Sequence, residues 1–421
     1  MTLSERDKKH LWHPLTQHKT SPAALPIIKA KGALLYDEQG QEYIDGISSW
    51  YTAVYGHCNE KITFKVAEQM QQLDQVVFSG FTHEPAVKLS EALIGILPSN
   101  QQKLFFNDNG STATEVGIKM ALQYHHNRGS KRHVMLAFEE GFHGDTFGAM
   151  SVSGLSVYNG AFKEHFIEVV RIPVPTGENN AKVLEQLQQL IKQHRIAGFI
   201  YEPLVQGAAA MKMHDAEGLN ALLAECQKND IVLVADEVMT GFGKTGKNFA
   251  SEYLEVQPDI ICLSKALTAG LLPMGVTSCS QKVFDAFYSN DLSKGLFHGH
   301  TYTANPPACA AALAGIELLT SAEMQENIQR QVNSHKAFGE KISSHPKVTN
   351  LRQLGVIFAF ELNVEIERYG NIRNQLFQHF LEQGIYLRPL GSTIYILAPY
   401  ITTDEQLQKI YDSIELALDK F

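Results

Sequence analysis

The chain has 421 residues, a formal net charge of −9, 44% hydrophobic and 19% charged residues, a composition typical of a globular protein with more than one domain. It has no run of lysines and arginines, so nucleic acid is not expected as a partner. No stretch reaches the roughly 18–20 apolar residues of a membrane span, and the charged start lacks the core of a signal peptide. Five scattered cysteines without a C-x-x-C pair indicate free thiols in a cytoplasmic protein.

Residues 1–57 predict a short helix, an extended proline-containing stretch and a hairpin. The hairpin strands are Leu34–Tyr36 and Glu42–Ile44, which flank the turn-type sequence Asp37–Gly40. This unit is too small to stand alone. We expect it to join a smaller α+β domain formed mainly by residues 311–421.

Residues 58–310 alternate between short apolar runs and helical stretches, which predicts an α/β domain with a mostly parallel sheet covered by helices. The expected strands are Leu104–Phe106, Val134–Ala137, Phe166–Arg171, Phe199–Glu202, Ile231–Ala235, Ile260–Leu263 and Gly275–Cys279.

Residues 311–421 predict local α+β structure. After a long helix we expect a strand at Val356–Leu362 and a helix at Ile372–Gln383. A hairpin of Ile385–Arg388 with Thr393–Leu397 and a closing helix from Asp404 complete the prediction.

Two of the predicted strands end in opposite charges. Lys265 follows Ile260–Leu263, and Asp236 follows Ile231–Ala235. A lysine at a strand end can simply reach the surface, but ligands of α/β sheets bind outside the carboxyl ends of the strands, where this lysine and this acid would face one molecule. Pyridoxal phosphate needs such a pair: an amine for its aldehyde and a carboxylate for its ring nitrogen. Glu202 ends a third strand, and a supporting role there is as plausible as direct contact with the cofactor.

Three loops offer further contacts to such a cofactor. Gly110 and Ser111 open a helix after the strand at Leu104–Phe106, where unpaired backbone N–H groups would hold a phosphate, although such residues also serve as ordinary helix caps. Phe142 lies at the tip of a turn and could stack on a pyridine ring or pack in the core. His298 and His300 lack a third metal ligand, so no metal is expected, and we prefer contacts from Thr301 to the phosphate.

The chain resembles the class III, fold-type I aminotransferases along essentially its whole length. The resemblance rests on Asn109–Ser111, Phe142–Gly144, Asp236–Gly246, Ser264–Leu267 and His300–Tyr302. It implies that Lys265 binds pyridoxal 5′-phosphate covalently, that Asp236 contacts its ring nitrogen, and that Gly110 and Ser111 hold its phosphate. It also implies an obligate homodimer in which Thr301 reaches the partner's phosphate.

Within this family the chain looks most like the enzymes that aminate 8-amino-7-oxononanoate in biotin synthesis, through Leu11–Pro14, Asp45–Trp50, His143–Ser151, Glu202–Ala208 and Leu387–Pro389 with Thr393–Tyr395. That resemblance implies that Trp50, Tyr51, Asp145, Arg388 and Tyr395 contact the substrate, with Arg388 pairing with its carboxylate.

Three positions depart from the family pattern. Leu15 and Phe142 stand where tyrosine is usual, and both leave the amino donor open between S-adenosylmethionine and lysine; Lys244 stands where arginine is common. The first alternative is another class III aminotransferase, for ornithine, 4-aminobutyrate or a polyamine. The others are an isomerase or decarboxylase on the same scaffold, such as a glutamate-semialdehyde aminomutase, and a non-catalytic cofactor-binding or regulatory protein.

Overall fold

The computed structural model of this chain describes residues 1–156, 159–363 and 371–421. Its centre is a seven-stranded sheet in the order β4-β12-β11-β10-β7-β5-β6. β12 runs antiparallel to β4 and β11, and the remaining neighbours in this sheet run parallel. The strands are β4 (Gln101–Asn107), β5 (Val134–Phe138), β6 (Val169–Ile172), β7 (Ile196–Tyr201), β10 (Val232–Asp236), β11 (Ile260–Leu263) and β12 (Gly275–Ser280). The predicted α/β class is confirmed. β6 begins three residues later than the predicted Phe166, because its pairing with β5 begins at Val169.

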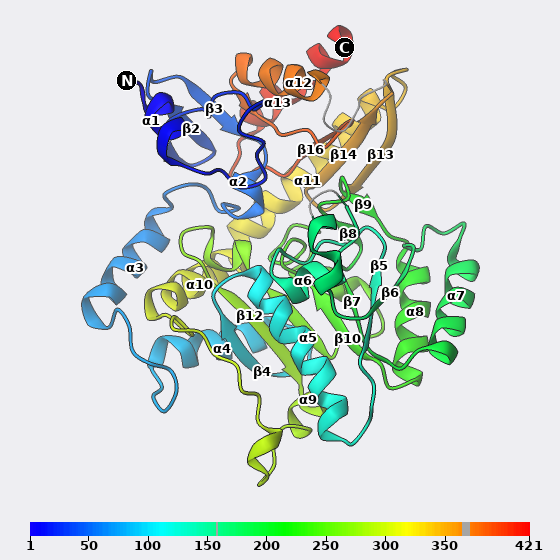
Figure 1. Ribbon diagram of the computed structural model, residues 1–421. Coiled ribbons are helices and arrows are strands. Elements are labelled where there is room, and N and C mark those ends of the chain that lie inside the picture. The colour runs from blue at the N-terminus through cyan, green and yellow to red at the C-terminus, as the bar shows by residue number, and fades with distance from the viewer. Residues whose placement is uncertain (157–158, 364–370) are drawn as a thin grey trace.

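Helices surround this sheet (Figure 1). α5 packs against β7, β10, β11 and β12, α8 packs against β10 and α7, and α10 packs against α3 and α4. Every residue of β5, β7, β10, β11 and β12 is buried, which explains why these strands read as continuous apolar runs in the sequence. These helices, with two shorter ones, are α3 (Glu60–Gln72), α4 (Glu84–Ile96), α5 (Gly110–Asn127), α6 (Phe147–Val152), α7 (Asn180–Gln193), α8 (Ala216–Lys228), α9 (Gln281–Asp285) and α10 (Pro306–Leu319).

A second sheet joins the two ends of the chain. It contains β1 (Ile27–Lys31), β2 (Leu34–Asp37), β3 (Glu42–Asp45) and β15 (Ile385–Tyr386). The predicted hairpin of β2 and β3 is confirmed, but the predicted hairpin after Ile385 is wrong. β15 pairs in parallel with β3 instead, because the free edge of β3 offers it a partner that the local sequence cannot reveal.

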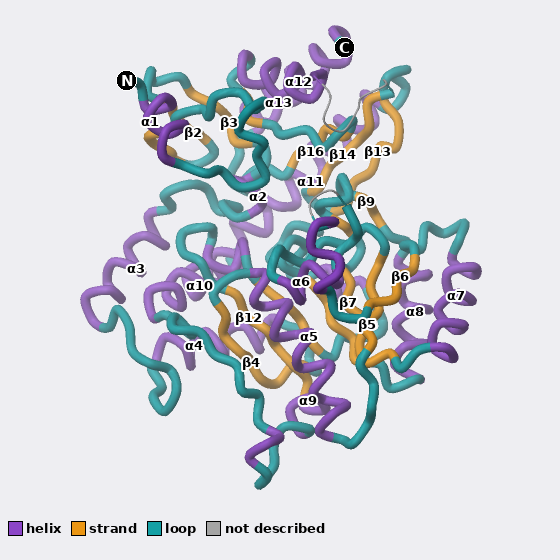
Figure 2. The backbone as a smooth tube through the Cα atoms, viewed as in Figure 1, coloured by secondary structure: helices purple, strands orange, loops and turns teal. Residues whose placement is uncertain are grey.

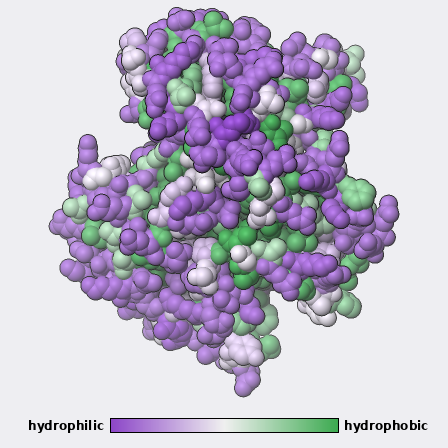
Figure 3. All heavy atoms as spheres, turned by 180° about the vertical axis from the view of Figure 1, so that it is seen from behind, coloured by the Kyte–Doolittle hydropathy of each residue, from purple (hydrophilic) through white to green (hydrophobic). Residues whose placement is uncertain are grey.

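A third sheet has the order β13-β14-β16, with β13 (Val348–Leu354), β14 (Ile357–Leu362) and β16 (Thr393–Ile396). No strand was predicted at the position of β13. α11 (Ala322–Ile342), α12 (Asn371–Glu382) and α13 (Asp404–Lys420) accompany these strands, and both chain ends lie in the upper lobe of Figures 1 and 2. Seen from behind, this smaller lobe lies above the larger one, and the surface is mostly hydrophilic (Figure 3).

The remaining elements are short. They are α1 (Leu3–His10), α2 (Ser48–Tyr51), the two-stranded pair of β8 (Val205–Gln206) and β9 (Lys212–Met213), and 3-10 helices at Ala250–Tyr253, Lys265–Thr268 and Leu292–Lys294. Across the residues described, none of the helices has the length and apolar character needed to cross a membrane.

Candidate active site

The predicted site residues of the large sheet come together at one edge. Asp236 ends β10, Lys265 follows β11, Glu202 follows β7, and the turn of His143 follows β5. These four strands are neighbours and run parallel, so their carboxyl ends meet on the same side of the sheet. The charges of Asp236 and Glu202 both act on the amine of Lys265, so the three side chains share one small region.

Asp236 is buried and held from two sides. Its Oδ1 accepts a hydrogen bond from the backbone N–H of Val238 at 3.1 Å, and its Oδ2 lies 2.7 Å from Nδ1 of His143. The backbone carbonyl of His143 in turn accepts a bond from the Thr114 hydroxyl at 2.7 Å. No role was predicted for His143. Its position after a strand and before Gly144 was the only signal.

Lys265 begins the 3-10 helix that follows β11, with a left-handed φ of 50°. Its amine lies 5.4 Å from the centre of the Tyr51 ring. Burial lowers the pKa of this amine, while the negative charges of Asp236 and Glu202 oppose that shift. A lowered pKa favours the neutral amine, which is the nucleophilic form.

Glu202 is buried and bonded to two backbone groups. Its carboxylate accepts from the N–H of Phe142 at 3.0 Å and from the N–H of Gly207 at 2.9 Å. Burial raises the pKa of Glu202 to about 7; the charge of Asp236 adds to this rise, and His143 and the two backbone bonds oppose it. The side chain of Phe142 stays 40% exposed, so its ring is free to meet a ligand.

The N-terminus of α5 is closely packed around Gly110, Ser111 and Gly144, a site that we call the cradle. Asn109 caps the helix by accepting from the N–H of Thr112 at 3.0 Å. A Cβ on Gly110 would come within 2.9 Å of Val238, and a Cβ on Gly144, whose φ is +127°, would come within 2.3 Å of the Ser111 hydroxyl. Glycine at both positions therefore allows the chain to pack this closely, and the N–H groups at the start of the helix are the kind that bind an anion.

A second group of predicted residues lies between the lobes. The Tyr51 hydroxyl donates to the Tyr395 hydroxyl at 3.1 Å, and the Arg388 guanidinium lies 5.2 Å from the centre of the Trp50 ring. Within the described residues Arg388 has no ion pair, so its charge is available to a ligand. Asp145 lies at the cradle, where its N–H donates to the Ser111 hydroxyl at 3.3 Å and partial desolvation raises its carboxyl pKa.

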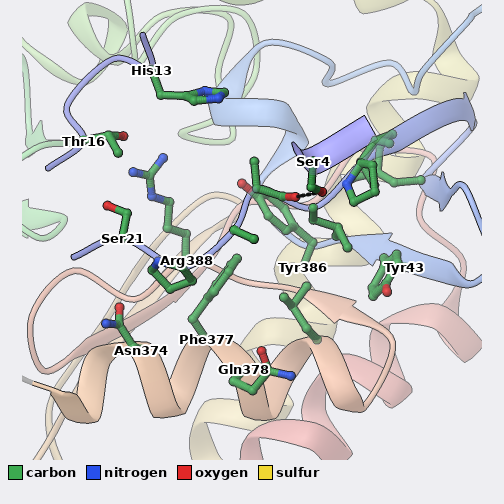
Figure 4. Close-up of a pocket in the computed structure, with 18 of the residues that line it drawn as sticks. Ser4, His13, Thr16, Ser21, Tyr43, Asn374, Phe377, Gln378, Tyr386 and Arg388 are labelled. Atoms are coloured by element: carbon green, nitrogen blue, oxygen red, sulfur yellow. Dashed lines mark hydrogen bonds between the residues drawn. The ribbon is translucent and has the colours of Figure 1, made fainter. Parts of the chain in front are cut away.

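A cavity of about 1080 Å³ opens beside Arg388 (Figure 4). Its walls come from the N-terminal residues 13–16 and 21–27, from α12 and from Trp50. Asn374, Phe377 and Gln378 extend into it from α12, and the guanidinium of Arg388 points toward Thr16. Leu15, where tyrosine is usual in the family, is part of the same wall. Neither Lys265 nor Asp236 is among the residues that line this cavity.

Thr301 lies apart from these groups on an exposed loop. Its carbonyl accepts a bond from the Gln75 side chain at 2.9 Å. In the same loop, His300 bonds His298 at 2.8 Å and lies 3.4 Å from the carboxylate of Asp108. Within the part of the chain that is described, no group of three or more His, Cys, Asp or Glu side chains could hold a metal ion.

The fold and this site define a class of protein. The family model for class III aminotransferases matches residues 15–418, and the chain belongs to that family. Such enzymes depend on pyridoxal 5′-phosphate, and a solved omega transaminase of Pseudomonas jessenii, in complex with PMP, shares 26% identity and a TM-score of 0.92 over 100% of this chain and 98% of its own.

Its similar relatives carry a more particular name. An adenosylmethionine-8-amino-7-oxononanoate aminotransferase of Synechococcus elongatus is 42% identical over 98% of this chain and 99% of its own. The solved enzyme of the same name from Methanocaldococcus jannaschii is 32% identical, with a TM-score of 0.94 over 99% of this chain and 98% of that one.

Proposed function

We propose that this enzyme transfers an amino group to the 7-keto carbon of 8-amino-7-oxononanoate and yields 7,8-diaminononanoate for biotin synthesis. The observation that carries this proposal is Arg388, which has no ion pair within the described part of the chain and lies 5.2 Å from the centre of the Trp50 ring, while the Lys265 amine lies 5.4 Å from the ring of the next residue, Tyr51. The substrate has a carboxylate at one end and a ketone further along its chain. The Arg388 guanidinium suits the carboxylate, and the Lys265 amine suits the chemistry at the ketone. The names of the relatives support the same substrate.

The residues at the strand ends fit pyridoxal phosphate. The cradle at Gly110 and Ser111 suits a phosphate, Phe142 is free to stack on the ring, and the buried carboxylate of Asp236 suits a protonated ring nitrogen. Glu202 holds the turn of Phe142 through a backbone bond. The cofactor, when bound, supplies an electron-accepting ring that stabilises negative charge on a carbon that has lost a proton.

Two side chains handle protons in this scheme. Lys265 would hold the cofactor, and its amine, once free, would move the proton of the donor α-carbon to the cofactor carbon. Asp236 keeps a proton on the ring nitrogen, and His143 fixes the carboxylate in place at 2.7 Å. The same amine returns a proton to the 7-carbon of the acceptor in the second half of the reaction.

The proposed substrate contacts come from five side chains. Arg388 binds the carboxylate, Trp50 and Tyr51 line its path, and Tyr395 orients the Tyr51 hydroxyl. Asp145, at the cradle, contacts the amino group of the substrate. We propose S-adenosylmethionine as the amino donor, with lysine as the alternative because Leu15 and Phe142 lack the usual hydroxyls.

We further propose a cytoplasmic homodimer in which Thr301 reaches the phosphate of the partner's cofactor. The exposed position of the Thr301 loop and the exposed apolar side chains Phe297 and Tyr302 beside it support an interface there. We also propose the domain division into 58–310 and a smaller unit of 1–57 with 311–421. Its support is that the large sheet shares no strand with the other two.

The direct test supplies purified enzyme with 8-amino-7-oxononanoate and either S-adenosylmethionine or lysine, and detects 7,8-diaminononanoate by mass. Product with one donor and not the other identifies the donor. Lys265→Ala should show no turnover and no visible absorption from a covalently held cofactor. Absence of product with both donors would favour another omega-aminotransferase, since solved omega transaminases also superpose with TM-scores up to 0.93.

A further inference from the structure

The short segment Ser48–Tyr51 has an unusual backbone. Its four residues have φ angles of 50°, 47°, 69° and 72°, so they form a left-handed turn without a single glycine. Left-handed helical geometry is unfavourable for L-residues other than glycine, and such residues persist only where their surroundings hold them. Something in the structure must therefore fix this turn.

Asp45 supplies that support from directly before the turn. Its carboxylate is fully buried and accepts from the N–H of Ile47 at 3.1 Å and from the N–H of Ser49 at 2.7 Å. The ring nitrogen Nε2 of His57 lies 2.7 Å from the same carboxylate. Two backbone donors and one side-chain donor thus converge on one buried carboxylate at the start of the turn.

The far side of the turn is bonded to the strand that follows Arg388. The Ser48 hydroxyl donates to the carbonyl of Leu397 at 2.7 Å, and the N–H of Leu397 donates to the carbonyl of Gly46 at 2.9 Å. A Cβ at Gly46 would come within 2.5 Å of the Leu387 side chain. The turn is therefore clamped between Asp45 and the segment 387–397.

This turn carries the two aromatic residues that meet the ends of the site. Trp50 lies against Arg388, and Tyr51 lies against the Lys265 amine and Tyr395. A small rotation of the turn would move both aromatic rings together. The same backbone conformation thus controls the carboxylate end and the amine end.

We propose that Asp45 is a positioning residue: it locks the Ser48–Tyr51 turn in its left-handed form and thereby sets the distance between the carboxylate site at Arg388 and the amine of Lys265. The identity of the bound carboxylate in this inference rests on the proposed function. Asparagine cannot replace this carboxylate, because its amide nitrogen is a donor and would face another donor.

The first test compares Asp45→Asn with Asp37→Asn in the cofactor-loaded enzyme. Asp37 is a matched control, because its buried carboxylate also accepts two backbone N–H groups and one side-chain donor, Tyr43, but in the β2–β3 turn. Asp45→Asn should raise the KM for 8-amino-7-oxononanoate about tenfold and lower kcat less than about threefold, whereas Asp37→Asn should change neither beyond about twofold. Equal effects of the two variants would overturn the proposal.

A second readout follows the turn itself, without turnover. Trp12 and Trp50 are the two tryptophans of the chain, so Trp12→Phe leaves Trp50 as the single reporter. In that background Asp45→Asn should raise acrylamide quenching of Trp50 by about twofold, because the turn loosens. Unchanged quenching would overturn the proposal, even if the substrate proves to be a different carboxylate.

A third test asks whether relief of the backbone strain in the turn restores substrate binding to Asp45→Asn. Glycine adopts positive φ without cost, so Ser49→Gly should restore most of the lost affinity in the Asp45→Asn background. A purely destabilising effect of Asp45→Asn would not be rescued in this way and would contradict the inference. If Asp45→Asn does not fold, His57→Ala removes one donor only and should move KM and quenching in the same directions; no movement in either would contradict the inference.

Discussion

The proposed cofactor end and the proposed carboxylate end of this site are built differently. Asp236, Glu202 and Lys265 lie at the ends of neighbouring strands of one buried sheet, so the register of that sheet places them. Trp50 and Arg388 come from segments more than 300 residues apart, and a few backbone bonds around a left-handed turn hold the first of them. A substitution at the cofactor end should therefore lower the rate of the chemical step and leave the positions of the other residues unchanged. A substitution at the carboxylate end should instead change how the substrate binds.

The largest effect is expected at the cofactor end. Asp236→Asn should lower kcat by about 10²- to 10⁴-fold, because the amide cannot keep the ring nitrogen protonated. KM should change little, since the sheet still positions the site. Steady-state rates at saturating substrate measure this change, with Asp285→Asn on the exposed end of α9 as the control. Activity within tenfold of the wild type would contradict the assignment of Asp236.

At the carboxylate end we expect a binding effect. Arg388→Met should raise the KM for 8-amino-7-oxononanoate by about 10- to 100-fold through loss of a charge-assisted hydrogen bond, with a smaller effect on kcat. The control is Arg128→Met, because Arg128 forms a surface ion pair with Asp230. If kcat falls and KM does not move, the two ends do not differ as described.

A pH-dependent effect tests Glu202 at the cofactor end. Its folded-state pKa of about 7 exceeds the ordinary value of 4.5, so the folded protein holds a proton that the unfolded chain releases. The stabilisation that comes from this retained proton is complete below 4.5, the ordinary pKa, and is lost as the pH rises through 7. Relative to Glu202→Gln, the cofactor-free wild type should therefore lose about 1–3 kcal/mol of unfolding free energy between pH 5 and pH 8.

Denaturant titrations at several pH values measure that difference. The exposed Glu68 provides the control, because Glu68→Gln should show no such trend. A wild type that gains stability relative to Glu202→Gln over this range would show that the pKa of Glu202 is not raised.

The smallest effect is expected at Lys244, which is fully buried with one bond from its amine to the Gly241 carbonyl at 2.9 Å. Burial lowers the pKa of this lysine well below its ordinary value, and the charge of Lys265 adds to that. Lys244→Met should stabilise the protein by about 1 kcal/mol at neutral pH. Lys244 binds a proton in the unfolded chain that it does not bind in the folded protein, so the wild type becomes more stable as the pH rises. The stabilisation gained by Lys244→Met should therefore shrink as the pH rises. Thermal unfolding at pH 7 and 9 tests both points; a destabilised Lys244→Met would refute them.

The two ends also differ in how far the sequence predicted them. The strands before Asp236 and Lys265 are continuous apolar runs in the sequence. Because parallel strands of one sheet end on the same side, this pattern predicted that the two residues lie on one side of the sheet. The pairing of His143 with Asp236 did not, because a histidine in a turn is equally consistent with a core position. The C-terminal hairpin was predicted wrongly, since β15 pairs with β3, whose residues lie 341 positions earlier in the chain.

By itself the sequence determined the α/β class, the alternation of buried strands and helices, and the charged residues at the strand ends, because hydrophobic periodicity and strand termini are local properties. Only the tertiary structure decided how the N-terminal segment and residues 387–397 clamp the Ser48–Tyr51 turn, and how Asp45 holds it. The reason is physical: a left-handed turn of non-glycine residues has no local sequence signal, and it exists only because partners distant in the chain offset its strain.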